Sequence, residues 1–144
     1  MPAWVQEGYR EYEKRLPREL KPVLNELALA PRSKNTTADE AKKIEAEYIL
    51  SAIDPRSTVI ALDLTGKFLS TQKLSTEMAH WQMEGKDVSI LIGGPDGFAP
   101  EVLQRANVRW SLSDLTLPHP LVRIVLIEQL YRAWTILQNH PYHK

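Results

Sequence analysis

The chain has 144 residues, enough for one domain with one hydrophobic core. Apolar residues make up 43% and charged residues 25% of the chain, and 18 basic residues balance 18 acidic ones. A formal charge of zero argues against a protein that coats nucleic acid through general electrostatics. Any RNA partner would have to be recognised locally or presented by other molecules or subunits. Cysteine is absent, which excludes disulfides, zinc–thiolate sites and a cysteine nucleophile.

The hydropathy pattern contains no run of about 18 uncharged apolar residues, because Arg123 and Glu128 interrupt the best candidate. We therefore expect no membrane span. The start of the chain has no basic segment followed by an apolar one, as a secretory signal would have. We expect a cytoplasmic protein.

The periodicity predicts strands alternating with helices. Strands are expected over Val23–Leu29, Ser57–Leu64, Val88–Ile92 and Val108–Leu112. Helices are expected over 3–16, from Thr37 to Asp54-Pro55, from Thr71 to Gly85, over 100–105, and after Pro120. This alternation predicts an α/β fold, an open and mostly parallel sheet flanked by helices, in a single domain over residues 1–144.

Local signals add detail for four of the helices. Thr37 and Glu40 form a capping box, and Thr65-Gly66-Lys67 reads as a turn. The helix after Pro120 is so apolar that we expect it to be buried nearly all round. The expected inner stripes are Trp4, Gly8, Tyr12 and Leu16 in the first helix, with Val5 and Tyr9 beside them, Ala41, Ile44, Tyr48 and Ala52 in the second, and Leu74, Met78 and Trp81 in the third.

Three strand ends carry residues that suit a ligand, since open α/β sheets bind ligands beyond the carboxyl ends of their strands. These are Leu62-Asp63, Gly93-Gly94 and the loop Ser113–Leu117. The sequence GGPDG indicates either a close approach of ligand to backbone or a tight turn that needs positive φ. It matches neither G-x-G-x-x-G nor a P-loop, so phosphate cradling is unsupported.

His119 lies between two prolines, and Arg123 follows four residues later on the same helical face. His119 could be a base, a hydrogen-bond donor or a helix N-cap partner, and the pair would suit an anion. Glu128 and Arg132 are spaced as a structural i,i+4 pair. The tail after Leu137 contains apolar residues, so we expect it to dock, a second subunit being one option. H-x-x-H at the end of the chain supplies two metal ligands at most, so we expect no metal site.

Several motifs together resemble one known family. They are LIGG at 91–94, SLSDLTLPHPLVR at 111–123, EQLYRAW at 128–134, HPYHK at 140–144, the pair Trp4-Val5, and Arg32, Lys34 and Asn35 of an R-x-K-N loop. The chain resembles, over nearly its whole length, the RlmH family of bacterial large-subunit ribosomal RNA methyltransferases in the SPOUT superfamily.

The resemblance implies an α/β domain with a deep C-terminal trefoil knot, an exception to the unknotted rule. It implies a homodimer that uses S-adenosylmethionine to methylate N3 of a pseudouridine in 23S ribosomal RNA of the large subunit. The family prefers the assembled ribosome as its substrate. That preference would account for the neutral charge, because the ribosome would present the RNA.

The resemblance also implies site residues. The cofactor-binding residues would be Leu62, Gly93, Gly94, Leu112, Ser113, Asp114, Leu115, Thr116 and Leu117. The proton acceptor or relay would be His119 or His143. Arg123 would stabilise the developing uracil anion or hold a phosphate, and Tyr142 would position the base, in the partner's site.

One departure from the family pattern concerns the start of the chain. Family members usually begin with an apolar strand about ten residues before M-P-x-W-V, so we expect that strand to be missing, a sheet edge or gap to result, and the fold to survive. Two alternatives remain open. One is a catalytically inactive ribosome-binding or RNA-binding module of the same fold, and the other is a generic α/β nucleotide-binding protein.

Overall fold

The computed structural model describes residues 2–31 and 33–143. The chain divides into two compact units, each described below by itself. The sheet unit comprises residues 25–68 and 86–114, and the helical unit comprises residues 1–24, 69–85 and 115–144.

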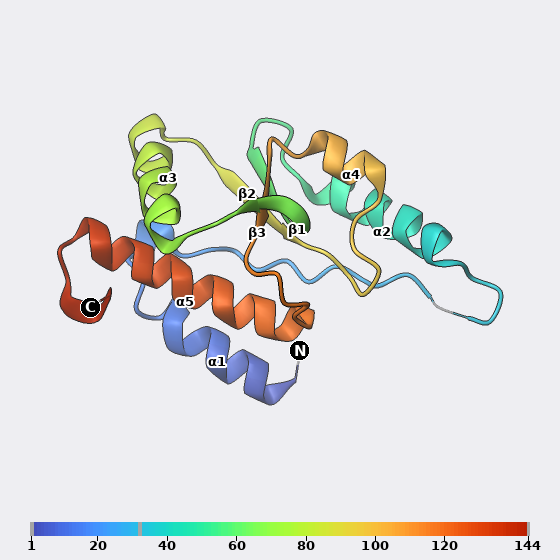
Figure 1. Cartoon of the computed structure of the whole chain (residues 1–144), viewed down its shortest axis with the longest axis horizontal. Helices are drawn as coiled ribbons and strands as arrows, with labels where there is room; N and C mark the ends of the chain where they lie inside the picture. Colours follow the sequence, from blue (N-terminus) through green and yellow to red (C-terminus); the bar gives the residue numbers. More distant parts are fainter. Residues whose placement is uncertain (1, 32, 144) are drawn as a thin grey trace. The chain divides into compact units, whose positions relative to one another are not determined.

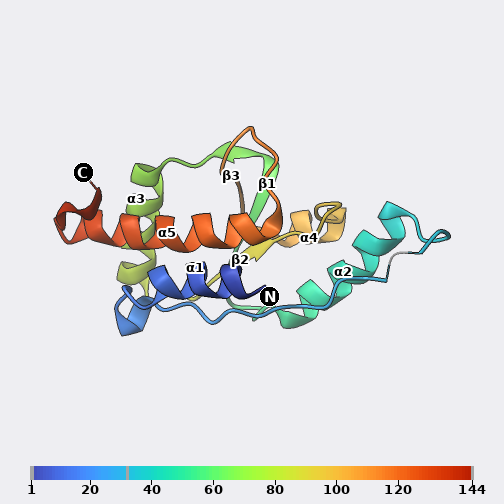
Figure 2. The ribbon, with the colours of Figure 1, turned by 90° about the horizontal axis from the view of Figure 1, so that it is seen from below.

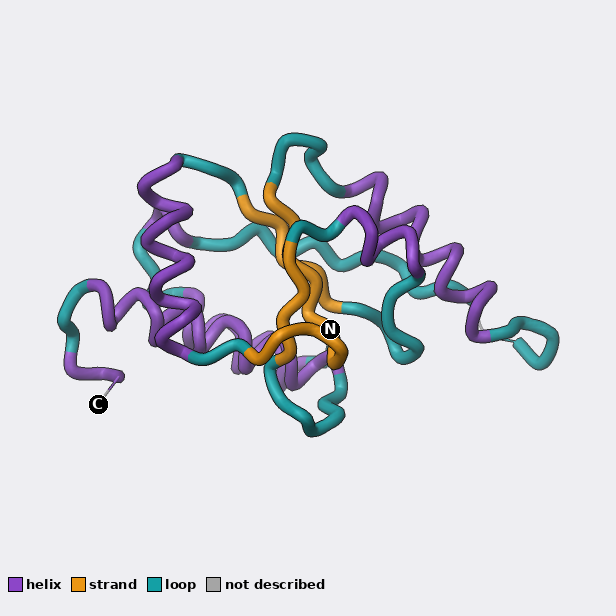
Figure 3. Tube along the Cα trace, turned by 45° about the horizontal axis from the view of Figure 1, so that its top comes forward, coloured by secondary structure: helices purple, strands orange, loops and turns teal. Residues whose placement is uncertain are grey.

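The sheet unit is built on three parallel strands in the order β2-β1-β3. They are β1 (Thr58–Phe68), β2 (Val88–Ile92) and β3 (Val108–Ser111), which run side by side in Figure 3. The helices α2 (Ala38–Ala52) and α4 (Pro100–Arg105) pack in the same unit. The prediction of an α/β fold with an open parallel sheet is confirmed.

Strand β1 is longer than the sequence predicted, and the expected turn at 65–67 lies inside it. Leu62 and Lys67 both pair with Trp110, so the register shifts between them. Gly66 lies against β3, since a Cβ on it would come within 2.5 Å of the carbonyl carbon of Arg109. Glycine is therefore required here by a crossing of two backbones and not by a turn.

The predicted strand over Val23–Leu29 is wrong. The segment from Lys21 to Pro31 has no regular structure, and Val23 is 86% exposed. Alternating apolar residues specify a strand only where a neighbouring strand completes the hydrogen-bond ladder, and no described strand pairs with this segment. The Ala30 N–H instead donates to a side chain, that of Glu45, at 2.9 Å.

Helix α2 begins as predicted, with both hydrogen bonds of the capping box between Thr37 and Glu40. Its predicted inner stripe is correct only in its first half, because Ala41 is buried and Ile44 half-buried whereas Tyr48 and Ala52 are exposed. The buried residues are Ala41, Glu45 and Ala46. A stripe drawn only through apolar residues missed the face because a glutamate occupies its centre.

In the helical unit, α1 (Ala3–Glu13) and α3 (Thr71–Glu84) both pack on α5 (His119–Leu137), as Figures 1 and 2 show. Two short 3-10 helices, η1 (Arg18–Leu20) and η2 (Pro141–His143), complete the unit. The core of this unit includes Tyr9, Leu16, Ile127 and Tyr131.

Details of these helices differ from the sequence prediction. The buried face of α1 carries Val5 and Tyr9, whereas Trp4 is 53% exposed. The N-cap of α3 is Ser70, whose hydroxyl accepts from Lys73 N–H, and not Thr71. Gly85 ends α3 in the left-handed region, as predicted, with φ +64°.

Helix α5 is not buried all round, contrary to the prediction. Leu121 is 40% exposed and Val125 36% exposed, one turn apart on the same side. The buried residues of the helix are Ile127, Tyr131, Ala133 and Thr135. An apolar surface thus remains on the first half of this helix. Within the described chain no helix has the length and apolar character needed to cross a membrane.

Candidate active site

The carboxyl edge of the sheet gathers three of the predicted cofactor-binding positions. Leu62 on the central strand pairs on one side with Ile92 and on the other with Trp110. Gly93 follows Ile92 directly, and Leu112 follows Trp110 after one residue. Because all three strands are parallel, Leu62 in β1 lies level with the carboxyl ends of β2 and β3, where Gly93 and Leu112 follow.

The glycine turn, residues 93–97, leaves the sheet at this edge. It is closed by a hydrogen bond from Gly97 N–H to the Gly94 carbonyl at 3.0 Å. Only Gly97 has positive φ, at +80°. The turn interpretation of the sequence GGPDG therefore explains Gly97 and leaves Gly93 and Gly94 to be explained by other means.

Gly93 and Gly94 differ in what surrounds them. A Cβ on Gly94 would lie 2.9 Å from Glu45 Oε1, so a side chain there would require the carboxylate to shift. A Cβ on Gly93 would meet its nearest atoms at 3.4 Å, an ordinary contact with the Phe98 ring and with Gly97. The described protein would thus accept a methyl group at residue 93. Neither backbone conformation nor packing demands glycine there, which fits a position that a ligand approaches.

The loop after β3 contains the other predicted cofactor-binding residues. Ser111 is buried, and its hydroxyl donates to the Ser113 carbonyl at 3.0 Å, which fixes the first turn of the loop. Leu115 is 70% exposed. Residues 112–114 belong to the sheet unit and residues 115–117 to the helical unit. The loop presents apolar side chains and backbone groups, which suit a ring with polar edges.

His119 is the first residue of α5 rather than part of the loop before it. The N-cap is Pro118, which offers no side-chain capping hydrogen bond. Arg123 lies one turn further along and is half-buried. Burial and the neighbouring Glu13 raise the pKa of Tyr9 to about 12, and the positive charge of Arg123 opposes that shift. A cation and an imidazole therefore share the first turns of this helix.

The tail turns back on α5 through Asn139, which has φ +55°. His140 N–H donates to the Thr135 carbonyl at 2.8 Å, and Asn139 N–H donates to the Ile136 carbonyl at 3.2 Å. These two bonds form a Schellman motif, with asparagine in the place usually taken by glycine. The tail therefore docks on its own chain.

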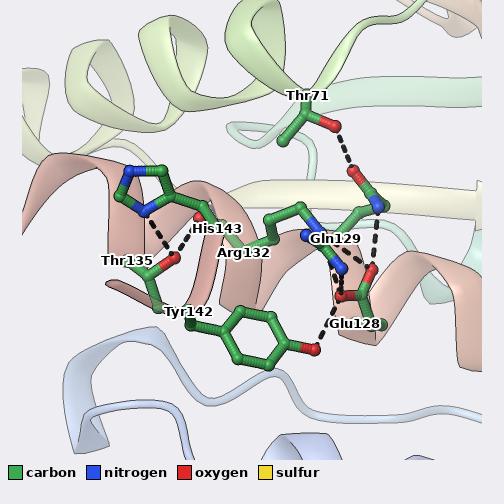
Figure 4. A network of polar contacts seen from close by, with 7 residues as sticks. All are labelled: Thr71, Glu128, Gln129, Arg132, Thr135, Tyr142 and His143. Carbon is green, nitrogen blue, oxygen red and sulfur yellow. Dashed lines mark hydrogen bonds and ion pairs between the residues drawn. The ribbon is translucent and has the colours of Figure 1, made fainter. Parts of the chain in front are cut away.

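A network of polar contacts holds the docked tail (Figure 4). The Tyr142 hydroxyl donates to Glu128 Oε2 at 2.9 Å, and Arg132 Nη2 lies 2.6 Å from the same oxygen. The Arg132 guanidinium lies 5.0 Å from the centre of the Tyr142 ring, and the Tyr131 ring meets that ring edge-on at 4.6 Å. Burial and the hydrogen bond to Glu128 raise the pKa of Tyr142 to about 12.

The network continues from Glu128 to α3. Gln129 Nε2 donates to Glu128 Oε1 at 2.8 Å, and Gln129 Oε1 accepts from the Thr71 hydroxyl at 2.6 Å (Figure 4). His143 Nδ1 lies 3.5 Å from the Thr135 hydroxyl oxygen, which is long for a hydrogen bond. Tyr142 is thus firmly held, whereas the imidazole beside it is loosely held.

One chain does not bring its candidate histidines together. His119 opens α5, and the tail histidine contacts Thr135, sixteen residues further along. At 1.5 Å per residue, the two levels on the helix are about 24 Å apart. His119 and Arg123 form one group, and Tyr142 and His143 form another.

Three contributing residues were missed by sequence reasoning. Asn139 reverses the chain, and its signal was an asparagine just after a long helix. Glu128 was predicted as half of a structural ion pair, which is confirmed, but it also anchors Tyr142. Glu45 was missed because a charged residue on a helix is ordinarily assigned to the exposed face. Arg32 of the R-x-K-N loop lies outside the described residues.

The parallel sheet, with the glycine turn and the loop after β3 leaving its carboxyl edge, is an open α/β fold, a class in which ligands generally bind at that edge. More specifically, the chain belongs to the SPOUT methyltransferase family, since residues 1–143 match the family model described as "Predicted SPOUT methyltransferase".

Curated relatives carry the name "Ribosomal RNA large subunit methyltransferase H". The protein of Teredinibacter turnerae is 60% identical over 147 residues, and that of Saccharophagus degradans 61% over 144. In both cases all of this chain and 93% of the relative are covered. The protein of Hahella chejuensis is 52% identical. The family resemblance read from the motifs is confirmed. Among the described residues, no group of three or more acidic or histidine side chains is placed to hold a metal.

Proposed function

We propose that this protein methylates N3 of a pseudouridine in 23S ribosomal RNA, using S-adenosylmethionine and acting on assembled ribosomes. The observation that carries the proposal is the convergence of Leu62, Gly93 and Leu112 at one sheet edge, in a chain about 60% identical to large-subunit ribosomal RNA methyltransferases. Bacterial ribosomes are cytoplasmic, so the proposal includes that location.

The residues present fit a methyl donor of this kind. Glycine at residue 93 is not dictated by φ or by packing, which is expected where a ligand touches backbone. The leucines of the loop would hold an adenine ring, and the backbone groups of Ser113, Asp114 and Thr116 would read its edge. The donor would supply a methyl group activated by a sulfonium.

The reaction forms a bond between N3 and the methyl carbon, breaks the carbon–sulfur bond, and releases the N3 proton. We assign that proton to His119 or His143, because an imidazole nitrogen is a common proton acceptor in general acid–base catalysis. Arg123 would stabilise the negative charge that develops on the uracil ring, or hold a phosphate. Tyr142 would position the base, because its ring is fixed and half-exposed.

The active enzyme in this proposal is a homodimer. Leu121 and Val125 leave an apolar surface on α5, and Trp4 on α1 is also exposed. A second copy of the chain is the occupant, with the tail of one protomer serving the site of the other. The separation of about 24 Å along α5 between the two groups of candidates supports that arrangement, since one chain does not unite them.

The test uses ribosomes that lack the modification, incubated with the protein and radiolabelled S-adenosylmethionine. We expect label at N3 of one pseudouridine in 23S ribosomal RNA, and far less with protein-free 23S RNA. If the protein bound ribosomes but transferred no label, it would be the inactive binding module instead. Binding of nucleotides in preference to S-adenosylmethionine would indicate the generic nucleotide-binding protein.

A further inference from the structure

Glu45 is a buried carboxylate that the proposed reaction does not use. It lies in the middle of α2 and is only 6% exposed. Burying a carboxylate is costly unless hydrogen bonds or charges compensate. Glu45 Oε2 accepts a hydrogen bond from Ala30 N–H at 2.9 Å, which offsets part of that cost.

The other carboxylate oxygen faces the glycine turn. A Cβ built on Gly94 would lie 2.9 Å from Glu45 Oε1 and 3.3 Å from Leu29 Cδ2. The Gly94 backbone therefore packs directly against the carboxylate. Glu45 is the point at which α2, the coil at 29–30 and the glycine turn meet within the sheet unit.

The contact between Glu45 and Gly94 supports the glycine turn from the side of α2. The capping box fixes the start of α2, so Glu45 projects from a rigid support two turns later. On its other side the turn is closed by the hydrogen bond from Gly97 N–H to the Gly94 carbonyl. Without the carboxylate, a cavity would open next to Gly94, and the turn would lose the packing contact that supports it on this side.

We propose that Glu45 is a positioning residue that holds the 93–97 turn in the conformation that binds the methyl donor. The inference rests on the proposed function for its consequence, but the contact itself does not depend on the donor. Glu45 acts through Gly94 and does not touch the substrate. Its loss should weaken donor binding and leave the chemical step intact.

The test compares Glu45→Ala and Glu45→Gln with Glu47→Ala, an exposed glutamate on the same helix. Hydrogen exchange of the 93–97 peptide is measured without donor, and then donor Kd, KM and kcat. We expect faster exchange at Gly97 and about a tenfold rise in donor Kd and KM for Glu45→Ala, with kcat at saturating donor unchanged within twofold. Glu45→Gln keeps shape and one acceptor oxygen and should retain most of the affinity. Glu47→Ala should match the wild type.

A double substitution isolates the contact. Gly94→Ala places a methyl group against the carboxylate, so it should speed exchange in the turn by itself. Adding Glu45→Ala removes the obstructing oxygen, so the two effects should not add. Additive effects, or unchanged exchange in Glu45→Ala, would overturn the proposal. A wild-type protein that binds no donor would overturn the proposed function, and the exchange measurements would still decide the role of Glu45.

Discussion

The glycine turn and the docked tail are built by opposite means. Around the turn, the Gly94 backbone lies so close to Glu45 that a Cβ there could not be added without movement, and Gly66 in β1 is packed as closely against β3. Around the tail, the aromatic ring of Tyr142 is held by hydrogen bonds and charges among half-buried side chains. The first region owes its shape to close packing, and the second to a polar network.

We therefore expect substitutions in the two regions to have different effects, on stability in the closely packed region and on function in the tail. Where backbones are in close contact, an added atom must displace part of the sheet. Substitutions there should therefore lower the free energy of unfolding. In a half-exposed network, water can replace a lost hydrogen bond at a small net cost in free energy. Substitutions there should therefore change the position of the tail more than the stability of the fold.

Gly66→Ala should be the most destabilising change. Its Cβ would meet the Arg109 carbonyl carbon at 2.5 Å, and backbone cannot rotate away. We expect a loss of about 3 kcal/mol in the free energy of unfolding, measured with urea. Gly8→Ala is the matched control, since its Cβ would meet only the end of the Ile124 side chain at 2.8 Å. Equal losses for both variants would contradict the contrast.

Val125→Glu should weaken the proposed homodimer without unfolding the chain. Val125 is already 36% exposed, so the substitution removes little core packing. A charge buried between two copies should cost the dimer about 2 kcal/mol, a shift visible by light scattering over a dilution series. Met83→Glu, at an 83% exposed residue of α3, is the control. A monomeric wild type would refute the dimer.

Tyr142→Phe removes the hydroxyl that donates to Glu128 and keeps the ring. We expect a loss of about 1 kcal/mol or less in unfolding free energy, because the site is half-exposed. Methyl transfer should fall by more than this small loss of folded protein explains. Tyr48→Phe, at an exposed tyrosine of α2, should change neither quantity. A drop in stability matching that of Gly66→Ala would mean that the tail is part of the core.

The pH dependence of tyrosine ionisation should be the subtlest effect. Folding raises the pKa of Tyr142 from 10 to about 12. The contribution of this hydroxyl to the free energy of unfolding is therefore fully present below pH 10 and is lost as pH rises through 12. Ultraviolet titration of Tyr142→Phe should therefore lack one group ionising near pH 12. Tyr9→Phe should lack another, because burial raises the pKa of Tyr9 similarly. Ionisation of Tyr142 near pH 10 would show that its hydroxyl is not held by Glu128.

The sequence predicted what short-range signals determine. The capping box at Thr37, the end of α3 at Gly85, β2 and α4 all match the structure. It failed where the deciding contact is distant along the chain. The segment at 23–29 lacks a strand partner, and Gly66 is a backbone crossing rather than a turn.

The candidate site shows the same limit. Sequence motifs named the residues around the glycine turn and the tail, and strand pairing shows why Leu62 and Gly93 lie at one edge. No local pattern indicated that Glu45 packs beneath Gly94 or that Glu128 anchors Tyr142, because both contacts join distant residues. The assignment of donor-binding and catalytic roles stays a prediction.

In the proposed mechanism, the turn binds the donor while the tail and the start of α5 act in the transfer step. The most direct test is the rate of methyl transfer to ribosomes as a function of donor concentration. Gly93→Ala should reach the wild-type rate at saturating donor, because only binding is weakened. His143→Ala and Arg123→Ala should stay slow at every donor concentration, with donor affinity nearly unchanged. Recovery of both of the latter variants at high donor, or no recovery of Gly93→Ala, would contradict this division of roles.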